Sequence, residues 1–286
     1  MAKLNTVTAN AAQHVLLYGE PKSGKTQLAG ELAKHFNLIW FDLENGFTTL
    51  LKLPEEAQAR VDLIKLPDTK QFPIAIETML KVITTGKPVD ICDKHGKVNC
   101  ALCKKAEEPF TTVDINSLGT DTIVVIDSLT QLSNSTMNHL LRHITEDTYK
   151  PEWSDYRNQG ALLEKILSSI QQAQYNIVCI THVVETQLDD KTTKLVPMCG
   201  TTSFSRNTAK YFDHVILTQL KNRKHLAGSS TGFSVQALTG SRSDIELENG
   251  DTLLDIFRGK VKSPKVEETT GAMSALQRAK LKAQGK

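Results

Sequence analysis

Five short apolar runs are the strongest pattern along the chain. They are rich in β-branched and aromatic residues and bounded by polar positions, which is typical of strands buried on both faces of a parallel sheet. The runs are VLLY at 15–18, LIWF at 38–41, IVVI at 123–126, IVCI at 177–180 and HVILT at 214–218.

Between most of these runs, apolar positions recur at spacings of three and four, which predicts amphipathic helices. The helical segments expected are 27–35, 74–84, 129–145 and 156–173. Strands that alternate with helices form a parallel sheet covered on both faces. We therefore expect an α/β fold with a mostly parallel, twisted sheet and helices on both sides of it.

Three segments break this alternation. Residues 87–109 are rich in charge and carry three cysteines, which indicates an insertion. Residues 183–210 are polar and lack a clear period, so they predict a long loop of the kind that is usually functional or mobile. From Gly259 the chain is rich in Lys, Thr and Gln, which predicts disorder with a helix at 274–283. We expect one domain over 1–258, with the insertion inside it, and a basic tail over 259–286.

Composition adds a charge asymmetry to this picture. The net charge of the 286 residues is +2, but the tail alone has six Lys and one Arg against two Glu, a net of +5, which leaves −3 for residues 1–258. The sequence has no run of 18 apolar residues and no signal-peptide pattern, so we expect a soluble protein that contacts no membrane. Five cysteines, an odd number, do not suggest a disulfide framework, and a reducing cytoplasm is the expected location.

The segment GEPKSGKT at 19–26 matches the phosphate-loop pattern G-x-x-x-x-G-K-[ST] between a predicted strand and a predicted helix. In such a loop, backbone N–H groups and the helix N-terminus face the phosphates. Lys25 would reach the β- and γ-phosphates, and Thr26 would bind Mg²⁺ through its hydroxyl. The expected nucleotide-binding residues are Gly19, Glu20, Pro21, Lys22, Ser23, Gly24, Lys25, Thr26 and Gln27.

Polar residues end three of the other predicted strands. Asp127 follows IVVI, where its carboxylate would hold Mg²⁺ through water, although it or Ser128 would also serve to cap the next helix. Asp42 and Glu44 follow LIWF, and Glu44 is the better candidate to activate water, unless both are solvated loop acids. His182 follows IVCI, where it would sense the γ-phosphate or have a purely structural role.

The insertion contains CDKHGKVNCALC at 92–103, in which Cys92, His95, Cys100 and Cys103 are spaced C-x2-H-x4-C-x2-C. Two close ligand pairs joined by a short turn suit one tetrahedral Zn²⁺. Because no open coordination position is evident, we expect a structural zinc, with chance clustering as the alternative.

Two stretches carry features of single-stranded nucleic acid binding. Residues 147–158 interleave aromatic and basic side chains, which stack on bases and contact phosphates, although the aromatics would equally start and pack the next helix. The stretch at 183–210 has basic residues diluted by acids. The residues concerned are Tyr149, Lys150, Trp153, Tyr156 and Arg157 in the first stretch, and Lys191, Lys194, Arg206 and Lys210 against Glu185, Asp189 and Asp190 in the second.

The motifs YGEPKSGKT, FDLENG, VIDSLTQL and ITHVVE, in this order over about 15–245, resemble the RecA-type P-loop ATPase core. More narrowly, they are similar to the short phage RecA-like ATPases that act as single-strand annealing recombinases. The resemblance implies that Glu44 is the catalytic base and that His182 replaces a sensor Gln. It also implies that 147–158 and 183–210 are the first and second DNA-binding loops.

Rings and filaments of this type complete the site with a cation from the neighbouring subunit, which stabilises transition-state charge. Arg242, just past a late strand, is the expected residue, with Lys221 and Arg223 as rivals. The chain is thus expected to be a homo-oligomeric, DNA-dependent ATPase that uses ATP and Mg²⁺ and binds single-stranded DNA in recombination or annealing.

Two other functions are compatible with the motifs: a helicase or packaging motor, and an ATP-gated adaptor with little turnover. The basic tail is a candidate contact for a single-strand-binding or replication protein. For a phage-encoded chain, the expected location is the host cytoplasm.

Overall fold

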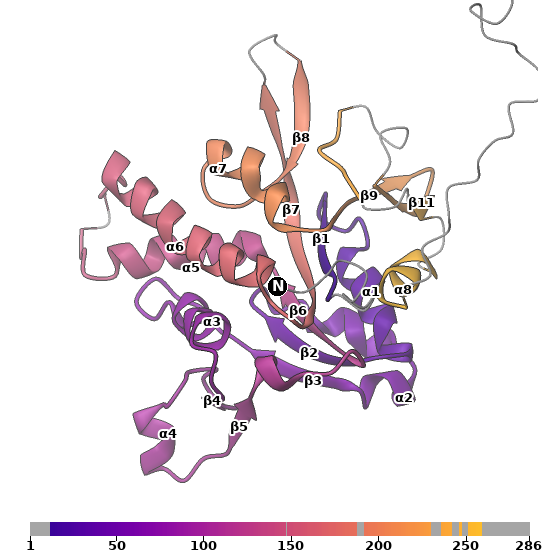
Figure 1. The fold of residues 1–286 in the computed structure, drawn as a ribbon. Coiled ribbons are helices and arrows are strands. Elements are labelled where there is room, and N and C mark those ends of the chain that lie inside the picture. The colour runs from indigo at the N-terminus through magenta and orange to yellow at the C-terminus, as the bar shows by residue number, and fades with distance from the viewer. Residues whose placement is uncertain are drawn as a thin grey trace, which may run out of the picture.

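The structure, a computed structural model, describes residues 12–146, 148–187, 192–229, 236–241, 246–247 and 251–258. Within these residues one sheet has nine strands, in the order β11-β10-β9-β1-β7-β6-β2-β3, with β8 paired to β7 (Figure 1). Its strands are β1 (His14–Gly19), β2 (Asn37–Asp42), β3 (Val61–Lys65), β6 (Thr122–Asp127), β7 (Asn176–Gln187), β8 (Thr193–Pro197), β9 (His214–Lys221), β10 (Lys224–Gly228) and β11 (Glu246–Leu247).

The central strands are parallel, as the apolar runs predict. β3, β2, β6, β7, β1 and β9 pair in parallel, while β8, β10 and β11 are antiparallel additions. The register places Gly19 beside His182 and Asp42 beside Asp127. One side of the sheet therefore carries Asp42 and Asp127 at the ends of β2 and β6, the phosphate loop after β1, and His182 within β7. An open α/β sheet binds its ligands on this side, beyond the carboxyl ends of its parallel strands.

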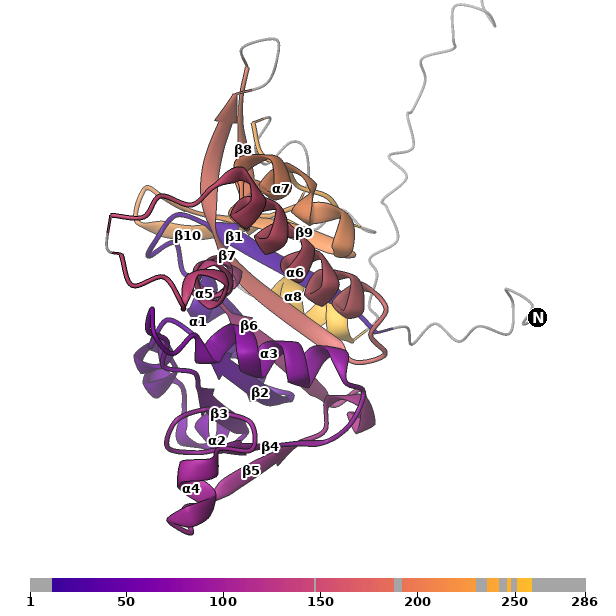
Figure 2. The same ribbon diagram turned by 90° about the vertical axis from the view of Figure 1, so that its left-hand side faces the viewer.

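Helices cover both faces of the sheet, and this confirms the predicted α/β fold class. The helices are α1 (Lys25–Gly30), α2 (Glu55–Gln58), α3 (Ile74–Thr84), α4 (Ala101–Lys105), α5 (Leu129–Leu141), α6 (Trp153–Gln171), α7 (Thr202–Asn207) and α8 (Asp251–Phe257). Figure 2 shows α3, α5 and α6 together on the face toward the viewer. No helix among the described residues is long and apolar enough to cross a membrane.

Alternation of side chains along the strands divides the interior into two cores. On β1, Leu16 and Tyr18 face the core under α3, α5 and α6, while Val15 and Leu17 face the core under α1 and α8. All four are fully buried, as expected of a central strand whose two faces are both covered. The resulting rigid sheet fixes the positions of the residues at its polar edge.

Two predictions about local structure are wrong. The segment 183–210 is not a long loop: β7 continues to Gln187 and pairs with β8 as an antiparallel hairpin, and α7 follows. The expected first loop at 147–158 is helical from Trp153 onward, because α6 begins there. In and directly after the predicted insertion, β4 (Val89–Cys92) pairs with β5 (Phe110–Val113) in a separate two-stranded sheet.

Several predicted features lie outside the described residues. They are Asp147, Asp189, Asp190, Lys191, Arg242 and the tail at 259–286 with its expected helix at 274–283.

Candidate functional site

The phosphate loop connects β1 to α1 and wraps around the Lys25 side chain. Lys25 is only 7% exposed, and its Nζ donates hydrogen bonds to the carbonyl oxygens of Gly19 at 2.9 Å and Glu20 at 2.8 Å. Burial lowers the pKa of Lys25, while the nearby carboxylates of Asp127 and Glu44 oppose this shift. A partly desolvated cation held inside the loop is suited to bind phosphate oxygens.

Gly24 needs to be glycine for two reasons. Its φ is +96°, and a Cβ atom there would lie 2.9 Å from His225 Nδ1. His225 on β10 donates from Nδ1 to the carbonyl oxygen of Ser23 at 3.0 Å, and the Ser23 hydroxyl lies 2.6 Å from that of Thr218 on β9. Thr218 and His225 thus support the loop from strands about 200 residues later in the chain, and no motif in the sequence pointed to either residue.

Thr26 and Asp127 meet beside the phosphate loop. The Thr26 hydroxyl donates to Asp127 Oδ2 at 3.0 Å, and burial raises the pKa of Asp127 to about 7. One hydroxyl and one carboxylate oxygen at this position fit the oxygen donors that Mg²⁺ prefers. The Ser128 hydroxyl accepts the backbone N–H of Gln131 and so caps α5, which leaves the Asp127 carboxylate free of that role.

Asp42 and Glu44 have different environments although only one residue separates them. Asp42 is buried and accepts backbone N–H groups of Glu44 at 3.2 Å, Gly46 at 3.0 Å and Phe47 at 3.2 Å. It therefore organises the turn that follows β2. The Glu44 side chain projects from this turn toward Ser128, which follows β6, and His182, which lies within β7.

The Glu44 carboxylate contacts side chains from two neighbouring parts of the sheet, one directly after β6 and one within β7. It accepts a hydrogen bond from the Ser128 hydroxyl, and its Oε1 lies 3.5 Å from His182 Nε2. Burial opposes ionisation of Glu44, but the contacts with His182 and Ser128 and the charge of Lys25 outweigh it, so the pKa of Glu44 is lowered. An ionised, oriented carboxylate beside a phosphate loop is suited to accept a proton from water.

The predicted residues of the nucleotide site thus come together on the side of the sheet where the carboxyl ends of the parallel strands lie. They are Lys25, Thr26, Glu44, Asp127 and His182. Arg242 lies outside the described residues, and its rivals Lys221 and Arg223 are exposed around the β9–β10 turn.

A groove of about 570 Å³ lies between the first turns of α6 and the segment formed by α7 and the turn after it. Trp153 is 81% exposed at its rim and Tyr156 is 40% exposed, so packing against the core does not explain these aromatics. Its lining includes two basic residues, Arg157 and Lys210, and one acid, Glu164.

Hydrogen bonds connect this groove to the nucleotide site. The backbone N–H of Met198 donates to the carbonyl oxygen of His182 at 2.8 Å, and the Thr181 hydroxyl donates to the carbonyl oxygen of Met198. Three residues further on, the Thr201 hydroxyl caps α7 by accepting the N–H of Phe204. The part of β7 that carries His182 therefore holds the segment that leads into α7.

The four residues of the predicted zinc cluster also come together, in the insertion. One ligand atom from each of Cys92, His95, Cys100 and Cys103 lies within 4.8 Å of the others. The three thiols are buried and none forms a disulfide.

Comparison with known proteins places this site in a family. Residues 11–243 match the family described as AAA domain, whereas comparison with curated proteins found no match. Similar solved structures include an ATPase from the type III secretion system of pathogenic bacteria, at 13% identity and a TM-score of 0.39, over 73% of this chain and 51% of that one. Another is the flagellar accessory protein FlaH from Methanocaldococcus jannaschii, at 14% identity and a TM-score of 0.36, over 76% and 78% of the two chains. This chain spans about half the length of the first. Since the family match covers most of the sequence, the chain belongs to the AAA domain family.

Proposed function

We propose that this protein is a Mg²⁺-dependent ATPase that binds single-stranded DNA and acts in recombination or single-strand annealing. The groove at the start of α6 is the observation that carries the DNA-binding part of the proposal. Exposed aromatic rings beside basic side chains are the combination that single-stranded nucleic acids use, because rings stack on bases and cations contact phosphates.

The groove provides both kinds of contact within a few residues. Trp153 and Tyr156 are three apart on α6 and so share one side of that helix. Arg157 follows on the same helix, and Lys210 approaches from the turn after α7. Glu164 Oε1 lies 4.0 Å from Lys210 Nζ and so reduces the positive charge of the groove, which favours a binding mode based on stacking over one based on charge alone.

Binding of ATP would be communicated to the groove through His182. A γ-phosphate contact at His182 favours one position of this part of β7, which holds Met198 and the segment leading to α7. DNA and ATP then stabilise the same state of this segment, which makes their binding cooperative.

We also propose that the protein works as a homo-oligomeric ring or filament in which Arg242 reaches the nucleotide of the next subunit. The site formed by the described residues of one chain has Lys25 as its cation against the carboxylates of Glu44 and Asp127. A second cation from a neighbour would stabilise the negative charge that develops during phosphoryl transfer.

The first test is the affinity for single-stranded DNA, measured by fluorescence anisotropy with a labelled oligonucleotide and a slowly hydrolysed ATP analogue. Trp153→Ala is expected to weaken binding roughly 10-fold, because loss of one base–aromatic stack costs about 1–3 kcal/mol. ATP affinity should not change, since Trp153 lies outside the nucleotide site.

Phe72→Ala is the matched control, because Phe72 is also an exposed aromatic residue but does not line the groove. Equal DNA affinity of wild type and Trp153→Ala would contradict the proposed site. If wild type itself binds no single-stranded DNA with either nucleotide, the DNA-binding function is wrong.

The second test concerns coupling. DNA affinity of wild type is expected to be higher with the ATP analogue than with ADP, and His182→Ala should reduce this difference several-fold, because the alanine cannot contact the γ-phosphate. The ratio of the two dissociation constants is the quantity to compare.

His143→Ala, which replaces an exposed histidine beyond the end of α5, should keep the wild-type ratio. A ratio near one in wild type, or an unchanged ratio in His182→Ala, would argue against coupling through His182.

A further inference from the structure

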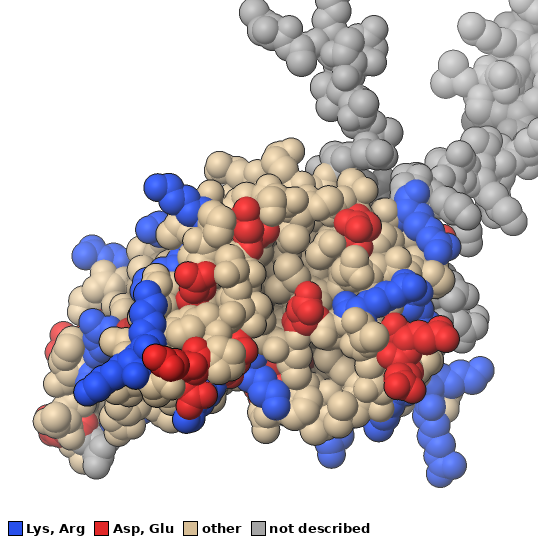
Figure 3. All heavy atoms as spheres, turned by 90° about the horizontal axis from the view of Figure 1, so that it is seen from below, with Lys and Arg blue, Asp and Glu red and all other residues tan. Residues whose placement is uncertain are grey.

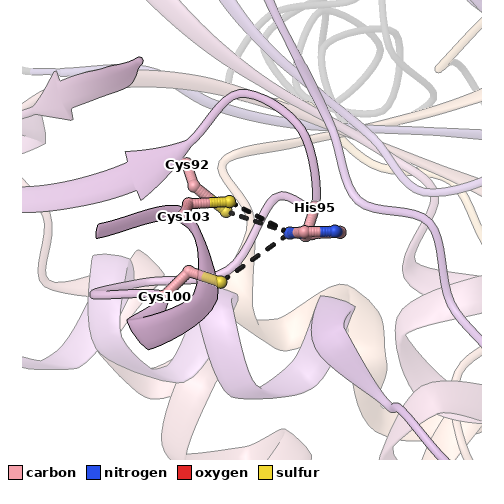
Figure 4. A group of neighbouring side chains, drawn as sticks. All are labelled: Cys92, His95, Cys100 and Cys103. Carbon is pink, nitrogen blue, oxygen red and sulfur yellow. Dashed lines mark hydrogen bonds between the residues drawn. The ribbon is translucent and has the colours of Figure 1, made fainter. Parts of the chain in front are cut away.

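The insertion between α3 and β6 holds a cluster of ligand atoms away from the nucleotide site. Figure 4 shows the sulfur atoms of Cys92, Cys100 and Cys103 directed at one ring nitrogen of His95. The distances from His95 Nδ1 are 3.1 Å to Cys103 Sγ, 3.7 Å to Cys100 Sγ and 4.0 Å to Cys92 Sγ. With Zn–S of about 2.3 Å and Zn–N of about 2.0 Å, tetrahedral coordination requires S–N separations of about 3.5 Å. The observed distances lie around this value.

The backbone of the insertion presents these atoms from three different places. Cys92 ends β4, and His95 lies in the turn that follows. Cys100 is the N-cap residue of α4, and Cys103 lies within this helix. The turn is closed by the N–H of Gly96, which donates to the carbonyl oxygen of Cys92 at 2.9 Å. The ligand atoms therefore converge because β4, the turn and α4 are folded against one another.

Around the four ligand residues, in contrast to the rest of the insertion, little other than a metal would hold the chain together. Ile91, Val98 and Val113 of the insertion pack into the large core that also contains residues of α3. The thiols of Cys92, Cys100 and Cys103 form a separate cluster with Phe110 packed against it. A core of this size buries too little apolar surface to offset the conformational entropy of the segment. Tetrahedral binding of Zn²⁺ supplies folding free energy directly in such small units.

The turn that carries His95 is also seated on the ATPase core. A Cβ atom at Gly96 would lie 2.3 Å from the carbonyl oxygen of Lys65 at the end of β3, so the turn and the strand end are in close contact. The buried Thr78 hydroxyl on α3 donates to the carbonyl oxygen of Gly96 at 2.7 Å. Next to Lys65, the N–H of Leu66 donates to the carbonyl oxygen of Asp42, which organises the Glu44 turn.

The outer surface of the insertion does not favour a phosphate-binding role. Lys94 is paired with Glu108 at 2.7 Å. On the face seen from below in Figure 3, basic and acidic side chains are interspersed over the visible residues. Support of the neighbouring strand ends accounts better for the position of the cluster than nucleic acid recognition does.

We propose that Cys92, His95, Cys100 and Cys103 bind one Zn²⁺, with His95 coordinating through Nδ1, and that this metal fastens the insertion to the end of β3 through the turn at Gly96. All four positions are filled by protein ligands, so the site is structural and closed. This inference is independent of the proposed function in DNA binding.

Elemental analysis of untagged wild-type protein, purified in reducing buffer without added metal, tests the metal. About one zinc per chain is expected, and Cys100→Ser/Cys103→Ser should retain less than roughly a tenth of an equivalent. Cys199→Ala removes a buried thiol outside the cluster and should keep the full zinc content. The decisive measurement is made on wild type, so poor folding of a variant does not affect it. Zinc below roughly a tenth of an equivalent in wild type would overturn the proposal.

Limited proteolysis tests the attachment. Removal of zinc from wild type by a chelator should increase cleavage within 89–113 at least several-fold, and re-addition of Zn²⁺ should restore protection. Thr78→Val removes the hydrogen bond to Gly96 and preserves the side-chain shape, so it should increase cleavage while zinc content stays near one. Unchanged cleavage in both zinc-depleted wild type and Thr78→Val would refute the attachment.

Discussion

Glu44→Gln is expected to bind ATP with nearly wild-type affinity and to hydrolyse it about 10²- to 10⁴-fold more slowly, the usual contribution of a general base. Gln keeps the shape of Glu and still accepts a hydrogen bond from the Ser128 hydroxyl, but it cannot take a proton from water. Single-turnover hydrolysis with saturating Mg²⁺ and ATP, with and without single-stranded DNA, measures this effect separately from binding.

Glu56→Gln on α2 is the matched control, because it makes the same chemical change at an exposed position. It should hydrolyse ATP at the wild-type rate. Hydrolysis by Glu44→Gln within a few-fold of wild type would show that another group activates water, and buried Asp42 would not replace it, since its carboxylate is used by three backbone N–H groups.

The fold class follows from the sequence because the central strands are buried on both faces and therefore read as continuous apolar runs. The same reasoning misses β3, the outermost strand on one side of the sheet, because only Ile64 of this strand is buried and no apolar run stands out. The hairpin of β7 and β8 carried a signal: VVET at 183–186 and TKLV at 193–196 are both β-prone and flank a mostly polar stretch of sequence. We predicted a loop there because charged and polar residues are frequent in this part of the sequence.

The residues of the nucleotide site were also predictable, because each ends an apolar run and parallel strands end at one sheet edge. The individual contacts of these residues could not be predicted from the sequence. Sequence position does not show that Asp42 is used by its own turn while Glu44 projects to Ser128 and His182, since both acids follow the same strand. Support of the phosphate loop by His225 depends on the pairing of β10 beside β9, which no local pattern specifies.

Lys25→Ala is expected to weaken ATP binding about 100-fold. Nζ of Lys25 is buried in the phosphate loop and is the cation placed to bind the β- and γ-phosphates. Loss of charge-assisted hydrogen bonds to a phosphate costs about 1.5–3 kcal/mol each, and about 2.7 kcal/mol corresponds to 100-fold in affinity. This differs from Glu44→Gln, which should bind ATP and fail only at hydrolysis. Titration with a fluorescent ATP analogue measures the difference.

Thermal unfolding gives a second measurement that does not depend on activity. At an ATP concentration 100 times the wild-type dissociation constant, binding stabilises wild type by about 2.7 kcal/mol, but a variant weakened 100-fold gains only about 0.4 kcal/mol. The ATP-dependent rise in melting temperature should therefore nearly disappear in Lys25→Ala. Lys52→Ala, which removes an exposed lysine outside the phosphate loop, should keep most of it. An equal rise in wild type and Lys25→Ala would mean that the phosphates bind elsewhere in the protein.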